Sequence, residues 1–271
     1  MTHPGPADPS GSEPSARTPR RRMPSPARGP RARRTAGRAL LLLTGLALVT
    51  GCRGAEAPPR ASTDVLEAEG SGPSLPATET GYRVRLDGDA SAPGEFLVRG
   101  GGPGGIVRVT TGPGGIAWRA EDTVSDGPFR AEATFLQRGA PVDYREAYGI
   151  FVGGEELDGP DQRYTYLLVR GTGEFTVRRR SGAGTETLLE WTGHPAVAGV
   201  EVEGAEPRNT LAVEADAEET RFVVNDAVVH RVSSEEAAPY GTAGLRVNHR
   251  LDLEVEAWAL EPLDGAGPPP S

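Results

Sequence analysis

The stretch FRAEATF, residues 129–135, alternates apolar and polar side chains with a period of two. Because successive side chains of a β-strand point to opposite faces of a sheet, this pattern predicts a strand with one face in a core. Short segments of the same kind recur through residues 81–263, separated by residues that favour turns. Asn225 and Asp226 separate two apolar runs, as the loop of a two-residue β-hairpin does.

No segment of this region shows apolar residues at sustained helical spacing. Many short strands joined by turns are typical of sandwich and jelly-roll architectures. We therefore expect an all-β fold over residues 81–263, a jelly-roll β-sandwich of two antiparallel sheets.

The chain opens with a basic segment and a short apolar run. Residues 1–51 carry nine arginines and two acidic residues, and an apolar run of about a dozen residues precedes Cys52. The run is too short to cross a membrane, and the arrangement is typical of a secretory signal. Its end, VTGC at residues 49–52, resembles the lipobox of bacterial lipoproteins, which implies that Cys52 is lipidated and becomes the mature N-terminus. Met23 is an alternative start that gives a signal of ordinary length.

Composition divides the remaining chain. Residues 52–80 are rich in alanine, proline, glutamate, serine and glycine, which predicts a flexible tether, and residues 264–271 form a similar tail. We expect an exported protein, lipid-anchored to the bacterial cell membrane or outer membrane and facing the periplasm or the exterior. Residues 52–271 carry 20 arginines and 36 acidic residues, a net charge of −16 that gives no support for nucleic-acid binding.

Several segments of the second half carry a family resemblance. They are AYGIFV at 147–152, YTYLLV at 164–169, FVVND at 222–226, GLRVN at 244–248 and LDLEV at 251–255. With them, residues 129–263 resemble the concanavalin A-like, laminin G-like jelly rolls of secreted bacterial proteins. The nearest resemblance is to the 3-keto-disaccharide hydrolase domain, which is also described as like the family 16 glycoside hydrolases. The resemblance implies the jelly-roll fold and a carbohydrate or other cell-envelope ligand.

We expect the sandwich to bind its ligand without catalysis. Aromatic rings supply stacking surfaces and a few polar groups fix orientation in such sites. The candidate ligand-binding residues are Tyr148, Tyr166, Trp191, Arg246 and Asn248. A structural module that only mediates protein contacts is a further alternative.

An enzyme is the second alternative, cleaving a glycoside or a 3-keto-glycoside. Glycoside hydrolysis needs two carboxylates that face a bound sugar. Asp252 and Glu254 share one face of the last predicted strand, with Trp258 expected on the same side, and His249 precedes them at a strand end. The competing interpretation is a solvated outer face of an acidic protein.

The sequence contains no cofactor-binding motif, and we predict no cofactor other than the calcium ion considered next. The acidic loop that contains Asp158 and Asp161 offers oxygen ligands for calcium, with a solvated loop as the alternative. The single cysteine excludes a disulfide framework and a cysteine-based zinc site.

Overall fold

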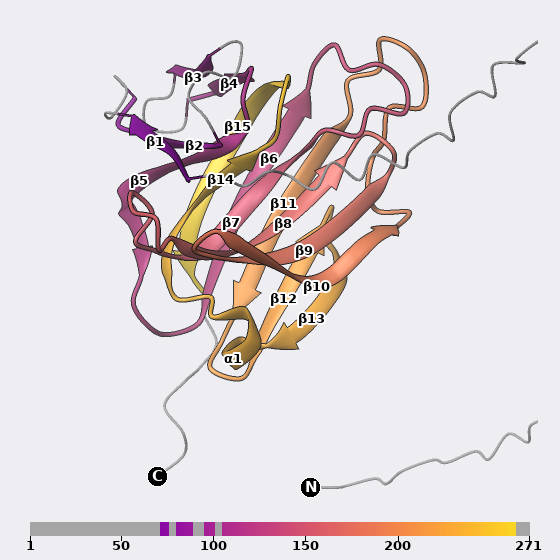
Figure 1. Ribbon diagram of the computed structural model, residues 1–271. Helices are drawn as coiled ribbons and strands as arrows, with labels where there is room; N and C mark the ends of the chain where they lie inside the picture. The colour runs from indigo at the N-terminus through magenta and orange to yellow at the C-terminus, as the bar shows by residue number, and fades with distance from the viewer. Residues whose placement is uncertain (1–70, 76–79, 89–94, 101–104, 264–271) are drawn as a thin grey trace, which may run out of the picture. The chain divides into compact units, whose positions relative to one another are not determined.

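The computed structural model describes residues 71–75, 80–88, 95–100 and 105–263. The chain divides into two units, residues 1–60 and 61–271, and every described residue belongs to the second. The described residues form two antiparallel sheets and one short helix, which confirms the predicted all-β sandwich (Figure 1). None of them belongs to a helix with the length and apolarity needed to span a membrane.

The first sheet, called sheet A here, has eight strands. In spatial order they are β1 (Ser71–Leu75), β2 (Arg83–Asp87), β5 (Gly115–Val124), β14 (Gly241–Val247), β7 (Ala147–Glu155), β8 (Arg163–Arg170), β9 (Glu174–Ser181) and β10 (Gly184–Gly193). β1 pairs with β2, so a strand lies within the range for which the sequence predicted a tether.

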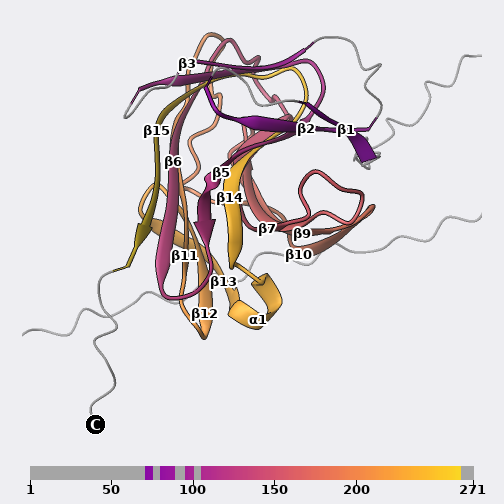
Figure 2. The same cartoon turned by 90° about the vertical axis from the view of Figure 1, so that its left-hand side faces the viewer.

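The second sheet, sheet B, has seven strands. In spatial order they are β13 (Ala227–Ser233), β12 (Glu219–Val224), β11 (Arg208–Ala215), β6 (Phe129–Gln137), β15 (Asp252–Pro262), β4 (Val107–Thr111) and β3 (Phe96–Gly100). The chain passes between the sheets repeatedly, for example from β4 to β5, from β5 to β6 and from β13 to β14. These crossings give the fold its jelly-roll character. Helix α1 (Ser234–Ala237) makes the connection from β13 to β14 at one end of the sandwich (Figure 2).

The main core lies between the two sheets. β6 contributes Phe129, Ala131, Ala133 and Phe135, the apolar set of the alternating stretch, and all four are buried. Side chains from the inner face of sheet A complete this core, and the ring of Tyr148 on β7 lies 5.2 Å from that of Phe135.

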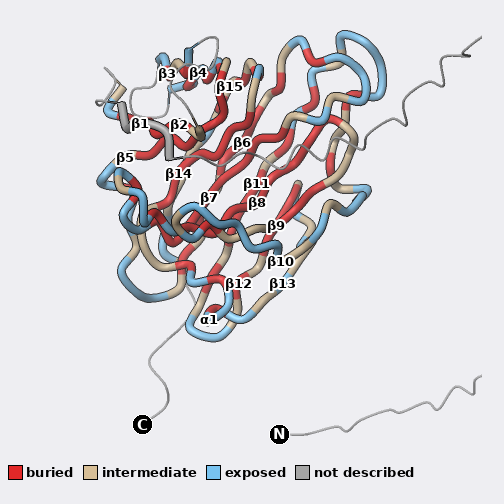
Figure 3. Tube along the Cα trace, viewed as in Figure 1, coloured by how far each residue is buried: buried red, intermediate tan, exposed pale blue. Residues whose placement is uncertain are grey.

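Sheet A is also buried on its outer face, the face turned away from sheet B. Strands β7 and β8 are buried along nearly their whole length, as Figure 3 shows. The side chains of a second apolar cluster cover this face. They are Ile116, Trp118, Ala147, Phe151, Leu157, Tyr164, Tyr166 and Leu168. Leu157 comes from the loop after β7, so this loop folds back over the sheet.

The predicted hairpin joins β12 to β13. Asn225 and Asp226 have φ values of 47° and 66°, which are the left-handed conformations that a type I′ turn requires at both central positions. Asparagine and aspartate tolerate this region better than most residues because their short polar side chains bond locally. The sequence therefore located this turn correctly.

Asn209 ties the start of β11 to two neighbouring segments and is fully buried. Its Nδ2 donates to the Tyr148 hydroxyl at 3.1 Å and to the Ala198 carbonyl at 2.9 Å. Its Oδ1 accepts from the Ala198 amide and from Asn225 Nδ2, both at 2.9 Å. One buried side chain thus holds the loop before β11 and the hairpin.

Replacing Asn209 by alanine is expected to lower the free energy of unfolding by about 3 kcal/mol, because a buried polar group that loses its partner costs about 1–3 kcal/mol. Urea denaturation measures this loss. Tyr148→Phe is the matched control, because it removes only one of the four hydrogen bonds and should cost about 1 kcal/mol. Equal losses in the two variants would contradict the role given to Asn209.

Candidate ligand-binding face

The outer face of sheet A carries a group of arginines among aromatic rings. Directly paired residues of antiparallel strands project from the same face. Arg85 pairs with Ile116, and Ile116 pairs in turn with Arg246, so the two arginines flank one residue of the second apolar cluster. The arginines that share this outer face are Arg83, Arg85, Arg170, Arg178, Arg180 and Arg246. The acidic residues of the same described strands on this face are Asp87 and Glu174.

Arg246 occupies the middle of this face and is fully buried. Its Nη1 lies 2.5 Å from Asp87 Oδ2 and donates to the Gly115 carbonyl at 3.0 Å. Its guanidinium carbon lies 5.8 Å from the centre of the Tyr166 ring, within the range of a cation–π contact. The Asp87 carboxylate, the Gly115 carbonyl and the Tyr166 ring therefore surround this guanidinium.

Arg85 is also buried, with 3% of its surface exposed. Its Nη1 donates to the Leu157 carbonyl at 3.5 Å, at the long limit of a hydrogen bond. Burial lowers the pKa of Arg85 below its ordinary value, and the Arg180 guanidinium acts in the same direction. Arg180 belongs to β9, which is five strands from β2 in sheet order. Both arginines nevertheless project from the outer face of sheet A.

Trp191 lies at the β10 rim of the same face and is half-buried. The guanidinium carbon of Arg170 lies 4.1 Å from its ring centre and that of Arg178 lies 5.9 Å away. Arg170 is held in turn by Glu174 at 2.8 Å. The result is an indole ring flanked by two cations and still accessible to solvent.

The structure brings some of the predicted ligand-binding residues together and separates one. Tyr166, Trp191 and Arg246 lie on the outer face of sheet A, and Asn248 follows β14 at the end of this face with 8% of its surface exposed. Tyr148 lies instead in the core between the sheets, with 1% exposed. Burial raises the pKa of its hydroxyl to about 12. Tyr148 therefore supports the fold and does not belong to this face.

The catalytic candidates lie elsewhere: Asp252 and Glu254 are on the outer face of sheet B, and His249 is in the loop between β14 and β15. Arg108 Nε bonds Asp252 Oδ1 at 3.1 Å, and Arg138 bonds Glu254 Oε2 at 2.8 Å. The hydrogen bond from Arg138 lowers the pKa of Glu254 below its ordinary value, which disfavours the protonated form that a general acid needs. His249 is 3.7 Å from Glu146.

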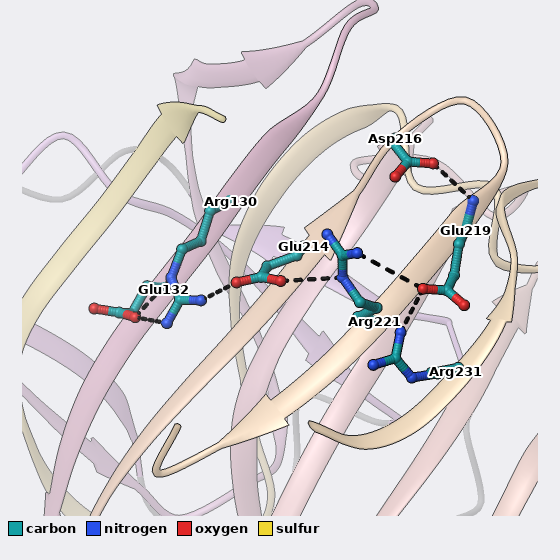
Figure 4. A network of polar contacts seen from close by, with 7 residues as sticks. All are labelled: Arg130, Glu132, Glu214, Asp216, Glu219, Arg221 and Arg231. Atoms are coloured by element: carbon teal, nitrogen blue, oxygen red, sulfur yellow. Dashed lines mark hydrogen bonds and ion pairs between the residues drawn. The ribbon is translucent and has the colours of Figure 1, made fainter. Parts of the chain in front are cut away.

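A network of ion pairs extends over the rest of the outer face of sheet B (Figure 4). Arg130 contacts both Glu132 and Glu214, and Arg221 joins Glu214 to Glu219. Arginines and glutamates alternate here across neighbouring strands. This face therefore has the character of a solvated, charge-balanced surface.

The acidic loop between β7 and β8 contacts sheet A through an arginine. Asp158 Oδ2 lies 2.5 Å from Arg83 Nη2, and Asp161 is exposed. Within the described part of the chain, no group of three or more histidine, cysteine, aspartate or glutamate side chains is arranged to hold a metal ion.

The fold and this face together define a jelly-roll β-sandwich with an arginine- and aromatic-lined outer sheet. No family model and no curated protein matches the sequence. Solved structures with a similar fold include the carbohydrate-binding module CBM66 from Bacillus subtilis, at 9% identity over 67% of this chain and 96% of that chain, with a TM-score of 0.44. The potassium-bound carbohydrate recognition domain of Emp46p has 13% identity over 69% and 95% of the chains, with a TM-score of 0.45. The Bacillus licheniformis beta-glucanase has 10% identity over 72% and 100%, with a TM-score of 0.42. At these sequence identities, the comparison with the three solved structures shows a similar fold and nothing more.

Proposed function

We propose that this protein is a non-catalytic carbohydrate-binding module of the bacterial cell envelope and that it binds its ligand on the outer face of sheet A. The observation that carries the proposal is the half-buried Trp191 ring with Arg170 and Arg178 beside it. An indole face packs against the apolar face of a sugar ring, and guanidinium groups donate hydrogen bonds to its hydroxyl oxygens.

The arrangement of the carboxylates favours binding over hydrolysis. The two acidic residues that the strands place on this face are both engaged, Asp87 by Arg246 and Glu174 by Arg170. Hydrogen bonds from Thr172 and Arg170 outweigh burial and lower the pKa of Glu174 below its ordinary value. A proton donor for a leaving group needs the opposite shift.

The envelope location rests on the N-terminal sequence alone. Cys52 lies outside the described residues, and its proposed role follows from the apolar run and the lipobox-like residues that precede it. Under this proposal the module is anchored to a membrane through lipid on Cys52 and presents the outer face of sheet A to a glycan.

Replacing Trp191 by alanine is expected to weaken glycan binding by about 10- to 100-fold, because the loss of a buried aromatic contact costs about 1.5–3 kcal/mol. A glycan array with the detergent-purified protein identifies the ligand, and isothermal titration calorimetry then compares the variants. Val228→Ala is the control, since Val228 is an exposed apolar residue of sheet B. Failure of the wild-type protein to bind any glycan would refute the proposed function, and unchanged affinity in Trp191→Ala would refute this site.

A further inference from the structure

The arginines on the outer faces of the two sheets differ in whether they have a carboxylate partner. On sheet B, Arg130, Arg221 and Arg231 each contact at least one glutamate. On sheet A, neither Arg85 nor Arg178 has a carboxylate within ion-pair distance among the described residues. Within the described part of the chain, Arg85 and Arg178 therefore lack the carboxylate partner that Arg83, Arg170 and Arg246 have on the same face.

Arg85 makes this difference costly for the folded protein. The residue is 3% exposed, and its Nε has no hydrogen-bond partner among the described residues. Removing a charge from water is unfavourable when its hydrogen-bonding groups are not all satisfied and no carboxylate reaches ion-pair distance. The Arg180 guanidinium repels Arg85, and the carboxylates of Asp87 and Asp158 attract it without reaching ion-pair distance. An anion at this position would relieve both the missing bond and the repulsion.

Arg178 extends the positive region to the accessible rim. It is half-buried, it contacts the Trp191 ring, and its Nε lacks a partner among the described residues. A ligand that stacks on Trp191 would therefore meet an unneutralised guanidinium beside the ring. Guanidinium groups bind carboxylate, sulfate and phosphate oxygens through paired hydrogen bonds that are stronger than those between neutral groups.

We propose that the carbohydrate bound by this face is acidic, a saccharide that carries carboxylate or sulfate groups, and that Arg85 and Arg178 receive those groups. The inference rests on the proposed function and specifies its ligand. The net charge of −16 over residues 52–271 opposes general adsorption of polyanions. Preference for an acidic glycan must therefore come from local contacts, which makes it attributable to individual arginines.

Matched pairs of polysaccharides test this inference. Isothermal titration with the detergent-purified protein compares polygalacturonate with its fully methyl-esterified form, and dextran sulfate with dextran, so that carboxylate and sulfate are tested separately. We expect at least one acidic member to bind about 10-fold or more tightly than its neutral partner, which corresponds to about 1.4 kcal/mol. Arg85→Met and Arg178→Met should each lower the affinity for the acidic member about 10-fold, lower the affinity for the neutral member by clearly less, and reduce the salt dependence.

The control variant is Arg231→Gln, which removes an arginine from the paired network on sheet B and should not change binding. Circular dichroism and the thermal midpoint establish that each variant is folded. Arg178→Met carries the test by itself if Arg85→Met does not fold, because Arg178 is half-buried. Equal affinity for neutral and acidic members, or an Arg178→Met variant that loses no more affinity for the acidic member than for the neutral one, would overturn the inference and leave the proposed function standing. Absence of binding to any carbohydrate would overturn both.

Discussion

Replacing Phe135 by alanine is expected to lower the free energy of unfolding by about 3–5 kcal/mol. Phe135 is fully buried on β6, which pairs with β11 on one side and β15 on the other. Its ring meets Tyr148 from the facing sheet. Truncation would therefore leave a cavity at the point where both sheets meet, and the surrounding strands are held in place by pairing and cannot collapse to fill it.

Guanidinium chloride denaturation followed by tryptophan fluorescence measures this loss. Val228→Ala, at an exposed apolar position on edge strand β13, should change the stability by less than about 0.5 kcal/mol. Phe135→Leu keeps most of the apolar volume and should fall between the two. A loss below about 1 kcal/mol in Phe135→Ala would mean that this ring is not central to the core.

The alternation of apolar and polar residues identifies the buried face of a strand where the other face meets solvent. In residues 129–135 it assigned Phe129 and Phe135 to the core correctly, because Arg130 and Glu132 mark the opposite face. The strand at 147–152 carries no such marker, since both of its faces are buried. Residue type alone therefore predicts Tyr148 and Tyr166 as ligand contacts together, although the structure places the two on opposite faces of sheet A.

An irregularity in β15 changed the position of Trp258. Strict alternation predicts that Trp258 shares a face with Asp252 and Glu254. The pairing with β6 shifts between Val255 and Ala257, and a bulge of this kind reverses the alternation beyond it. Trp258 accordingly packs against the core, and its Nε1 donates to Asp122 at 3.0 Å. The bulge therefore removes Trp258 from the face where it was expected to form a stacking platform beside Asp252 and Glu254. Nothing local in the sequence marks the bulge.

The arginine-lined face was only partly predictable. Arg246, Tyr166 and Trp191 were identified from residue type, but alternation in residues 82–86 would place Arg85 on a solvated face. The loop after β7 overturns that expectation, because Leu157 covers the outer face and takes the hydrogen bond from Arg85. The burial of Arg85 depends on how the loop after β7 folds back over the sheet. The alternation of residues within a single strand carries no information about that loop.

Replacing Cys52 by alanine is expected to abolish labelling of the protein by radioactive palmitate and to release it from the membrane fraction. The chain contains one cysteine, so the label has no second thiol to which it could be attached. Each buried methylene contributes about 0.8 kcal/mol to membrane binding, and two or more acyl chains are needed for a stable anchor. Complete loss of lipid should therefore change the protein from membrane-bound to freely extractable by buffer.

Ser62→Ala, ten residues further along the predicted tether, is the matched control and should keep both the label and the membrane association. Glycan affinity of Cys52→Ala should equal that of the wild-type protein, because the proposed binding face belongs to the sandwich and not to the tether. Label that persists in Cys52→Ala would refute lipidation at this residue. Loss of label together with loss of glycan binding would instead indicate that the anchor and the sandwich depend on each other, against the modular arrangement proposed for this chain.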